Sequence, residues 1–130
     1  MSASPSGLPD HRWPRAVYRA GEEPDPRFTL ANERTFLAWM RTALGFVAAG
    51  VAVAAVTSFA GRLEIEIRLT ALLLIACGLV SAGGGLWRWM ENERALRLGR
   101  RLPSTLLLPF VTGSLVVVAV VAAVVVGLSG

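Results

Sequence analysis

Three long apolar stretches alternate with short polar segments along the chain. They cover Ala43–Ala60, Leu69–Trp87 and Leu106–Leu128, and they contain no Asp, Glu, His, Lys or Arg. Each is close to the roughly 20 residues that an α-helix needs to cross about 30 Å of hydrocarbon. A helix on the surface of a soluble protein would carry a polar face, and the second and third stretches have none. The pattern therefore predicts an all-α integral membrane protein with three transmembrane helices.

The first predicted helix begins well before its apolar stretch. Asp25 suits the N-cap position and Pro26 suits the first helical position. Between Phe28 and Met40 the sequence is amphipathic at the helical period, so we expect a cytoplasmic amphipathic extension of the first span. The predicted three-helix domain covers residues 25–130, with helices at about 26–60, 67–90 and 105–128 and a charged linker at 90–104.

The first 24 residues are rich in Ser, Pro, Gly and Arg and hold little apolar area to bury. That composition predicts a disordered tail over residues 1–24. No cleavable signal is recognisable, because the first apolar stretch starts too far from the N-terminus. We therefore expect the first transmembrane helix to act as the insertion signal.

Arginine supplies all 13 basic side chains, and its distribution predicts the topology. Six arginines lie at or before Arg41 and five lie between residues 88 and 104, whereas two lie between 61 and 68 and none follows the third span. Positively charged residues concentrate on the cytoplasmic side. We therefore expect a cytoplasmic N-terminus and an external C-terminus.

Three of these arginines, Arg27, Arg34 and Arg41, are spaced seven residues apart. Seven residues are nearly two helical turns, so these side chains lie on one helix face, about 10 Å apart along the axis. We call them the arginine line. Small residues, which let membrane helices pack closely, continue its face into the span. They are Gly45, Ala49 and Ala52.

Two interpretations of the arginine line remain open. In the first, it sets the topology and contacts anionic lipid headgroups, at about 1 kcal/mol for each arginine. In the second, it is an anion-facing surface, which its position opposite the aromatic residues favours. Beyond Arg41 the face becomes apolar, whereas an open pore should have a polar lining. The sequence thus supports a charged cytoplasmic vestibule better than an open conduit.

The sequence contains no recognisable catalytic constellation. The spans lack acids, bases and metal ligands, and the soluble segments are too short for a catalytic domain. Cys77 is the single cysteine, so no intrachain disulfide can form, and we interpret it as a small packing residue. We therefore expect no enzymatic activity, no metal or other cofactor and no nucleic-acid partner.

One segment, residues 25–53, resembles the YidH family of small three-helix inner-membrane proteins. It reads DPRFTLANERTFLAWMRTALGFVAAGVAV, and its most specific part is ANERTFL at residues 31–37 followed by Trp39. The resemblance covers about residues 25–128 and implies a location in the bacterial inner membrane. The same fold forms the transmembrane domain of the vacuolar transporter chaperone (VTC) subunits, which make and translocate polyphosphate in eukaryotes. This chain lacks their polymerase and inositol-phosphate-sensing domains.

The resemblance also implies roles for particular residues. In the polyphosphate complex this domain assembles as a pentamer around a phosphate-lined path. Arg27, Arg34 and Arg101 match cations that face that path, and Glu33 matches an acid that helps to hold the helices together.

Glu33 lies among basic residues near the membrane, where an unpaired carboxylate would lose hydration. We therefore expect it to form a structural ion pair within its own or a neighbouring subunit. The candidate partners are Arg94, Arg97 and Arg101. The sequence Asn-Glu-Arg occurs at residues 32–34 and again at 92–94, and we interpret this echo as chance.

Two functions of different classes remain open. The first is an oligomer, pentameric by resemblance, with a cytoplasmic vestibule for anions such as phosphate or polyphosphate. Its anion-binding residues would be Arg27, Arg34, Arg41 and Arg101. The second is a non-transporting scaffold or assembly subunit that binds a partner protein or anionic lipid. In both cases we expect a homo-oligomer in membrane lipid, packed through Gly45, Ala49 and Ala52.

Overall fold

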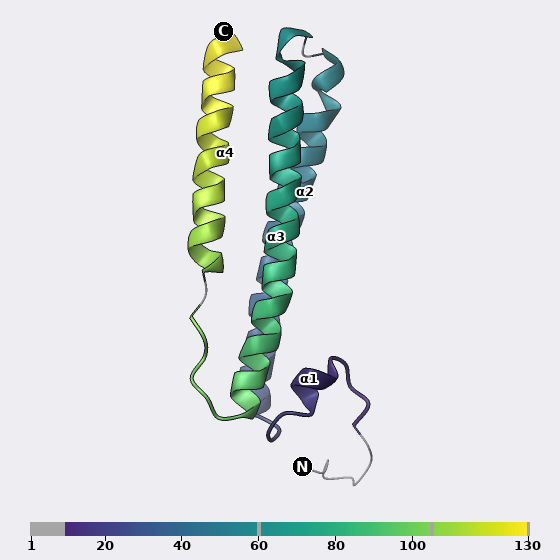
Figure 1. Cartoon of the computed structure of the whole chain (residues 1–130), viewed down its shortest axis with the longest axis vertical. Helices are drawn as coiled ribbons and strands as arrows, with labels where there is room; N and C mark the ends of the chain where they lie inside the picture. Colours follow the sequence, from purple (N-terminus) through teal and green to yellow (C-terminus); the bar gives the residue numbers. More distant parts are fainter. Residues whose placement is uncertain (1–9, 60, 105, 130) are drawn as a thin grey trace. The chain divides into compact units, whose positions relative to one another are not determined.

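The computed structural model describes residues 10–59, 61–104 and 106–129. These residues form three long α-helices, one short α-helix and two short 3-10 helices (Figure 1). The elements are α1 (Arg15–Tyr18), α2 (Pro26–Ala55), η1 (Thr57–Phe59), η2 (Gly61–Leu63), α3 (Glu64–Arg97) and α4 (Leu107–Ser129). No strand occurs in these ranges, and the predicted all-α fold class is confirmed.

Three helical stretches are long and apolar enough to cross a membrane. They are Pro26–Ala55 with 30 residues, Gly61–Arg97 with 37 residues and Leu107–Leu128 with 22 residues. Each exceeds the roughly 20 residues that a span requires. The predicted integral membrane protein with three membrane-spanning helices therefore agrees with the structure.

The helix bounds depart from the expected ones in two places. α2 ends at Ala55 rather than near residue 60, because η1 and η2 follow it. α3 continues to Arg97, so residues 90–97 of the predicted charged linker are helical. This stretch is not a solvated linker, because side chains in its last two turns are buried and hydrogen-bonded. They are Asn92, Glu93 and Arg97.

The chain divides into two compact units. The described residues of unit 1 are 10–38 and 85–104, and those of unit 2 are 39–59, 61–84 and 106–129. α2 and α3 contribute to both units, whereas α1 belongs to unit 1 and α4 to unit 2.

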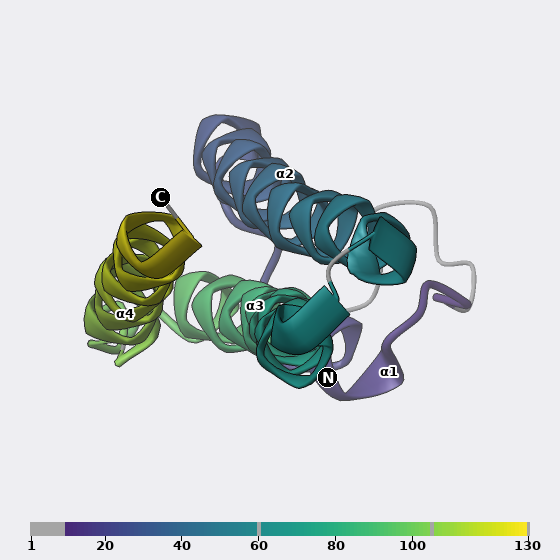
Figure 2. The same cartoon turned by 90° about the horizontal axis from the view of Figure 1, so that it is seen from above.

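In unit 2, glycines bring α2 and α3 close together. A Cβ atom at Gly50 of α2 would lie 2.8 Å from the carbonyl oxygen of Ala71, and one at Gly78 of α3 would lie 2.9 Å from that of Ala43. Each helix thus places a glycine against the backbone of the other, which is a common way for membrane helices to pack. α2 and α3 lie side by side when viewed from above (Figure 2).

α4 packs against the same part of unit 2. Phe46, Leu74 and Cys77 form a buried cluster, and Val111 and Val118 of α4 lie against it. No residue in the most apolar window of α4 is buried within the chain. Most of the α4 surface is therefore available to lipid or to another protein helix.

In unit 1, residues 10–24 fold against α3, and we call them the N-terminal arm. Val17 of α1 is 1% exposed, and Arg97 donates hydrogen bonds to backbone carbonyls of the arm. The prediction of a disordered tail is therefore wrong for residues 10–24, and residues 1–9 lie outside the described residues. The composition of this segment indicated too little apolar area to fold. The buried Arg97 holds it in place instead through hydrogen bonds to its backbone, and such contacts cannot be recognised from composition.

Candidate functional site

A pair of buried asparagines joins the two helices of unit 1. The side-chain amide of Asn92 on α3 donates a hydrogen bond to Oδ1 of Asn32 on α2, at 3.2 Å. The amide of Asn32 in turn donates to the backbone carbonyl of Trp89, at 3.0 Å. Both asparagines are at least 92% buried. Buried polar groups need such partners, so the pair fixes how these two segments face each other.

Glu93 places a carboxylate beside this pair. It is 1% exposed and accepts hydrogen bonds from the Thr29 hydroxyl at 3.0 Å and from the Asn32 amide at 3.4 Å. No salt bridge to Glu93 occurs among the described residues. Because a buried carboxylate is costly without partners, these hydrogen bonds tie the start of α2 to the end of α3. We call Thr29, Asn32, Asn92 and Glu93 the polar network.

Aromatic rings lie next to the polar network. The ring centroid of Trp89 is 6.5 Å from that of Tyr18 in the N-terminal arm and 6.4 Å from that of Phe36 on α2. Both pairs are tilted by 56°, a geometry that aromatic pairs commonly adopt. Trp89 thus contacts both the arm and α2.

Arg97 holds the N-terminal arm on α3. Its side chain is 2% exposed, and it donates to the carbonyl oxygens of Ala20 at 2.9 Å and Tyr18 at 2.8 Å. A third contact joins its Nη1 to a carboxylate oxygen of Glu23 at 3.3 Å. The guanidinium group is therefore satisfied by the arm, which explains how a charged side chain is buried here.

The backbone of the arm also meets α3 closely. Gly21 has φ +54°, and a Cβ atom there would lie 1.9 Å from the carbonyl oxygen of Arg97. The next amide, that of Glu22, donates to the same oxygen at 3.0 Å. Glycine is required at this position by both its left-handed conformation and the close approach.

Arg12 joins several residues within the arm. It forms salt bridges with Asp10, at 2.6 Å, and with Glu23, and its guanidinium lies 4.5 Å from the centroid of the Tyr18 ring. The hydrogen bond from Arg12, followed by that from Arg97, lowers the pKa of Glu23, and the Arg12 hydrogen bonds likewise lower the pKa of Asp10. Burial, with the nearby charge of Glu93, raises the pKa of Tyr18. The arm is thus held by charge as well as by packing.

The four arginines predicted to bind anions are all exposed. Arg27 lies 3.8 Å from Asp25, with a side chain that is 91% exposed. No salt bridge engages Arg34, Arg41 or Arg101 among the described residues. These guanidinium groups are therefore available, and no ion pair brings them onto a common partner among the described residues.

The arginine line and the polar network use different sides of α2. At about 100° per residue, Arg34 lies about 160° around the helix from Asn32, which faces α3. Asn32 is 7% exposed whereas Arg27 and Arg34 are exposed. The contact with α3 therefore leaves the arginine side of α2 uncovered in unit 1.

Glu33 is exposed, and no salt bridge joins it to an arginine among the described residues. An intrachain ion pair with Arg94, Arg97 or Arg101 is therefore not present in this part of the chain, and the pair with a neighbouring subunit stays a prediction. The buried carboxylate belongs instead to Glu93. The repeated Asn-Glu-Arg sequence, which we interpreted as chance, was the sequence signal for this carboxylate, because the asparagines of the two copies bond to each other.

The predicted packing residues lie away from the contact that the chain makes with itself. Gly45, Ala49 and Ala52 are exposed, and a Cβ atom at Gly45 would meet nothing within 4 Å. Gly50, about 140° around the helix from Gly45, faces α3 instead. The small-residue face is thus open in unit 2, and its role in assembly stays a prediction.

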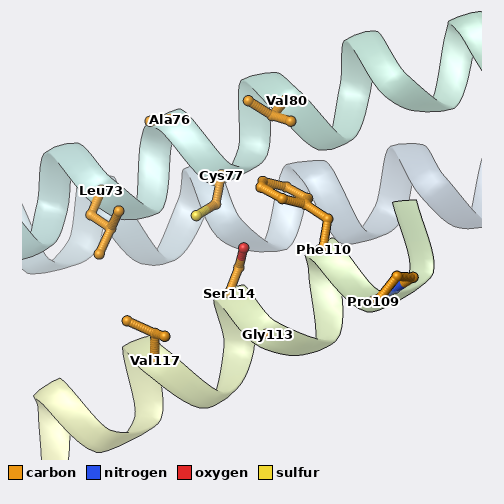
Figure 3. A pocket seen from close by; sticks show the side chains of 9 residues that line it. All are labelled: Leu73, Ala76, Cys77, Val80, Pro109, Phe110, Gly113, Ser114 and Val117. Carbon is orange, nitrogen blue, oxygen red and sulfur yellow. The ribbon is translucent and has the colours of Figure 1, made fainter. Parts of the chain in front are cut away.

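Unit 2 also contains an open apolar cavity of about 570 Å³ between α3 and α4. Cys77 and Ser114 reach into the space between these helices (Figure 3). The lining residues are Leu73, Ala76, Cys77, Val80, Pro109, Phe110, Gly113, Ser114 and Val117. None carries a charge, so this cavity suits hydrocarbon rather than an anion. No cluster that could hold a metal ion occurs among residues 10–59, 61–104 and 106–129.

Comparisons with known proteins place the chain in a family. The model of a domain of unknown function, DUF202, matches residues 27–95. The inner membrane protein YidH of Escherichia coli (strain K12) is 49% identical over 106 residues, which cover 81% of this chain and 90% of that protein. The uncharacterized protein Rv2272 of Mycobacterium tuberculosis (strain H37Rv) is 42% identical over 104 residues, which cover 77% of this chain and 81% of that protein. No solved structure matches significantly.

The matched segment contains the whole polar network and all three arginines of the arginine line. Together with three apolar helices, the similarity to an inner membrane protein indicates a bacterial inner membrane protein. Neither the family description nor the names of these relatives assign a biochemical activity. This chain belongs to the DUF202 family, the family of the inner membrane protein YidH.

Proposed function

We propose that this protein is a non-catalytic membrane subunit that assembles with copies of itself and binds anions in a cytoplasmic vestibule. Arg27, Arg34, Arg41 and Arg101 supply the cationic groups of the vestibule. Phosphate or polyphosphate is the proposed anion, because guanidinium groups bind phosphate oxygens in a bidentate manner. The N-terminus lies in the cytoplasm and the C-terminus outside.

One observation carries the proposal. The arginine side of α2 takes no part in the contact with α3, and its guanidinium groups remain exposed. Elsewhere in unit 1, Arg12 and Arg97 are neutralised by carboxylates of the arm. An exposed line of cations that continues into exposed small residues suits an oligomer in which Gly45, Ala49 and Ala52 pack against a neighbour. The arginines would then gather around the axis of the assembly.

The alternative function is a scaffold that binds a partner protein or anionic lipid and transports nothing. The apolar residues beyond Arg41 support this alternative, since an open pathway for ions needs a polar lining. Under the proposed function, the apolar region is a constriction that opens only with a partner.

Binding of inorganic polyphosphate to the full-length protein in nanodiscs tests the proposal. We expect Arg34→Glu to weaken binding at least tenfold, because it replaces an attraction with a repulsion in a shared vestibule. Arg62→Glu is the matched control, since Arg62 is also exposed but lies in η2, and it should bind as the native protein does.

Three outcomes separate the functions. Unchanged polyphosphate binding by Arg34→Glu refutes the vestibule. A monomeric mass both in mild detergent and in nanodiscs refutes the assembly around an axis. Binding of anionic lipid without binding of polyphosphate supports the scaffold.

A further inference from the structure

The N-terminal arm contacts α3 at two positions along the helix axis. The amide of Glu22 bonds to the carbonyl oxygen of Arg97, and the ring of Tyr18 lies against Trp89. Trp89 and Arg97 are eight residues apart, which is about 12 Å along the helix axis. Tyr18 lies between these two positions, because its carbonyl oxygen bonds to the Arg97 side chain and its ring lies against Trp89, so it is the part of this contact nearer the membrane span.

Trp89 marks the depth that the arm reaches. The apolar stretch of α3 ends at Trp87, and tryptophans near the end of a span lie at the membrane–water interface. Each headgroup layer is about 5 to 8 Å thick, the difference between a whole bilayer and its hydrocarbon core divided over two sides. A ring centroid 6.5 Å from that of Trp89 puts Tyr18, and α1 with it, at headgroup depth.

The side chains that the arm leaves uncovered at this depth match a lipid headgroup. Trp13 is 75% exposed, although a tryptophan gains most from an environment that is part apolar and part wet. Arg15 and Arg19 are exposed, four residues apart, and no salt bridge engages either among the described residues. Arg12 differs, because Asp10 and Glu23 already neutralise it.

We propose that the N-terminal arm is a membrane-surface element, in which Trp13 inserts between headgroups and Arg15 and Arg19 bind the phosphates of anionic lipids. Its docking on α3 through Arg97 delivers these side chains to the bilayer surface. This proposal is independent of the vestibule, since neither Arg15 nor Arg19 belongs to it. Two arginines near an anionic surface should shift the equilibrium between bound and released arm about 30-fold, equivalent to about 2 kcal/mol.

Depth measurements on spin-labelled full-length protein test the proposal. The labels are placed by Trp13→Cys or Glu22→Cys in a Cys77→Ala background, in nanodiscs of phosphatidylcholine with or without phosphatidylglycerol. We expect the label at residue 13 to be more accessible to oxygen than to a water-soluble nickel chelate when phosphatidylglycerol is present. The label at residue 22 should show the opposite preference, because the amide of that residue bonds to the carbonyl oxygen of Arg97, eight residues beyond Trp89 on α3.

Two charge variants that carry the label at residue 13 test whether Arg15 and Arg19 cause the effect of phosphatidylglycerol on its depth. Arg15→Gln with Arg19→Gln should abolish the effect of phosphatidylglycerol on depth, whereas the control Arg62→Gln with Arg68→Gln should preserve it. Arg97→Gln should make the label mobile and water-exposed, because the arm loses its hold on α3.

The proposal is overturned if labels at residues 13 and 22 are equally accessible to the nickel chelate in anionic nanodiscs. It is also overturned if the Arg15 and Arg19 variant keeps the response to phosphatidylglycerol. Immobilisation of the residue-13 label in lipid-free detergent, with no effect of lipid charge, would assign this surface to a protein contact instead.

Discussion

The side-chain amide of Asn92 bonds to Oδ1 of Asn32 at 3.2 Å, so the end of α3 recognises the start of α2 through a buried polar pair. The other amide contacts of Asn32, with the Trp89 carbonyl and the Glu93 carboxylate, surround this bond. Sliding one helix by a residue would break several of these hydrogen bonds together. The polar network therefore specifies the register of unit 1, as buried polar residues do in helical assemblies.

We expect Asn32→Ala to lower the free energy of unfolding by about 2 to 4 kcal/mol, because it leaves the Trp89 carbonyl and the Asn92 amide buried without their partner. Equilibrium unfolding in mixed detergent measures the change. Glu33→Ala is the control at the adjacent, exposed position and should stay within about 0.5 kcal/mol of the native protein. Equal stabilities of the two variants would show that the network does not hold unit 1 together.

The sequence carried enough information to predict the three spans, because a membrane helix needs a long run of apolar residues and little else. It also predicted the start of α2, where Asp25 accepts a hydrogen bond from the Arg27 amide at 2.9 Å. These features depend on residues close together in the chain. They could therefore be predicted without knowledge of tertiary contacts.

The polar network and the N-terminal arm depend on partners far apart in the sequence. Asn32 and Asn92 are separated by 60 residues, and Arg97 bonds to a carbonyl 79 residues away at Tyr18. A charged stretch such as residues 90–97 is ordinarily solvated, so composition predicted a linker. Only the antiparallel pairing of α2 with α3 turns the repeated Asn-Glu-Arg sequence into a contact.

The glycines of unit 2 differ in what surrounds them, and this predicts opposite effects of the same change. Gly78→Ala should destabilise the protein by about 1 to 3 kcal/mol, because its Cβ would lie 2.6 Å from Val47 Cγ2 and 2.9 Å from the Ala43 carbonyl oxygen. Gly83→Ala meets nothing within 4 Å and should stabilise α3 by about 0.5 to 1 kcal/mol. Thermal unfolding in detergent measures both. An unchanged unfolding temperature for Gly78→Ala would mean that α2 and α3 are not in close contact at this position.

Gly45→Leu separates folding from assembly. Since nothing lies within 4 Å of a Cβ at Gly45, we expect the variant to fold with native stability but to lose oligomer mass. Native mass spectrometry and light scattering in mild detergent measure the mass, and thermal unfolding checks the fold. Gly83→Leu makes the same change at another open position and should leave the mass unaltered. A native mass for Gly45→Leu would exclude this face as the interface.

Acid should release the N-terminal arm. Arg12 and Arg97 lower the pKa of Glu23 below its ordinary value of 4.5, and Arg12 also lowers that of Asp10 below 3.8. A carboxylate with a lowered pKa contributes stability above its unfolded pKa and loses it as the pH falls through the folded value. The arm should therefore stay docked from pH 7 to about pH 4.5 and loosen below that.

A spin label at residue 22 reports this release as increased mobility between pH 7 and pH 3. Asp10→Asn with Glu23→Gln removes both titrating partners of Arg12, so it should abolish most of the acid transition and raise mobility already at pH 7. Glu33→Gln neutralises an exposed acid outside the arm and should retain the native transition. If the double variant still loosens at the same pH as the native protein, the transition arises elsewhere and these two carboxylates do not hold the arm.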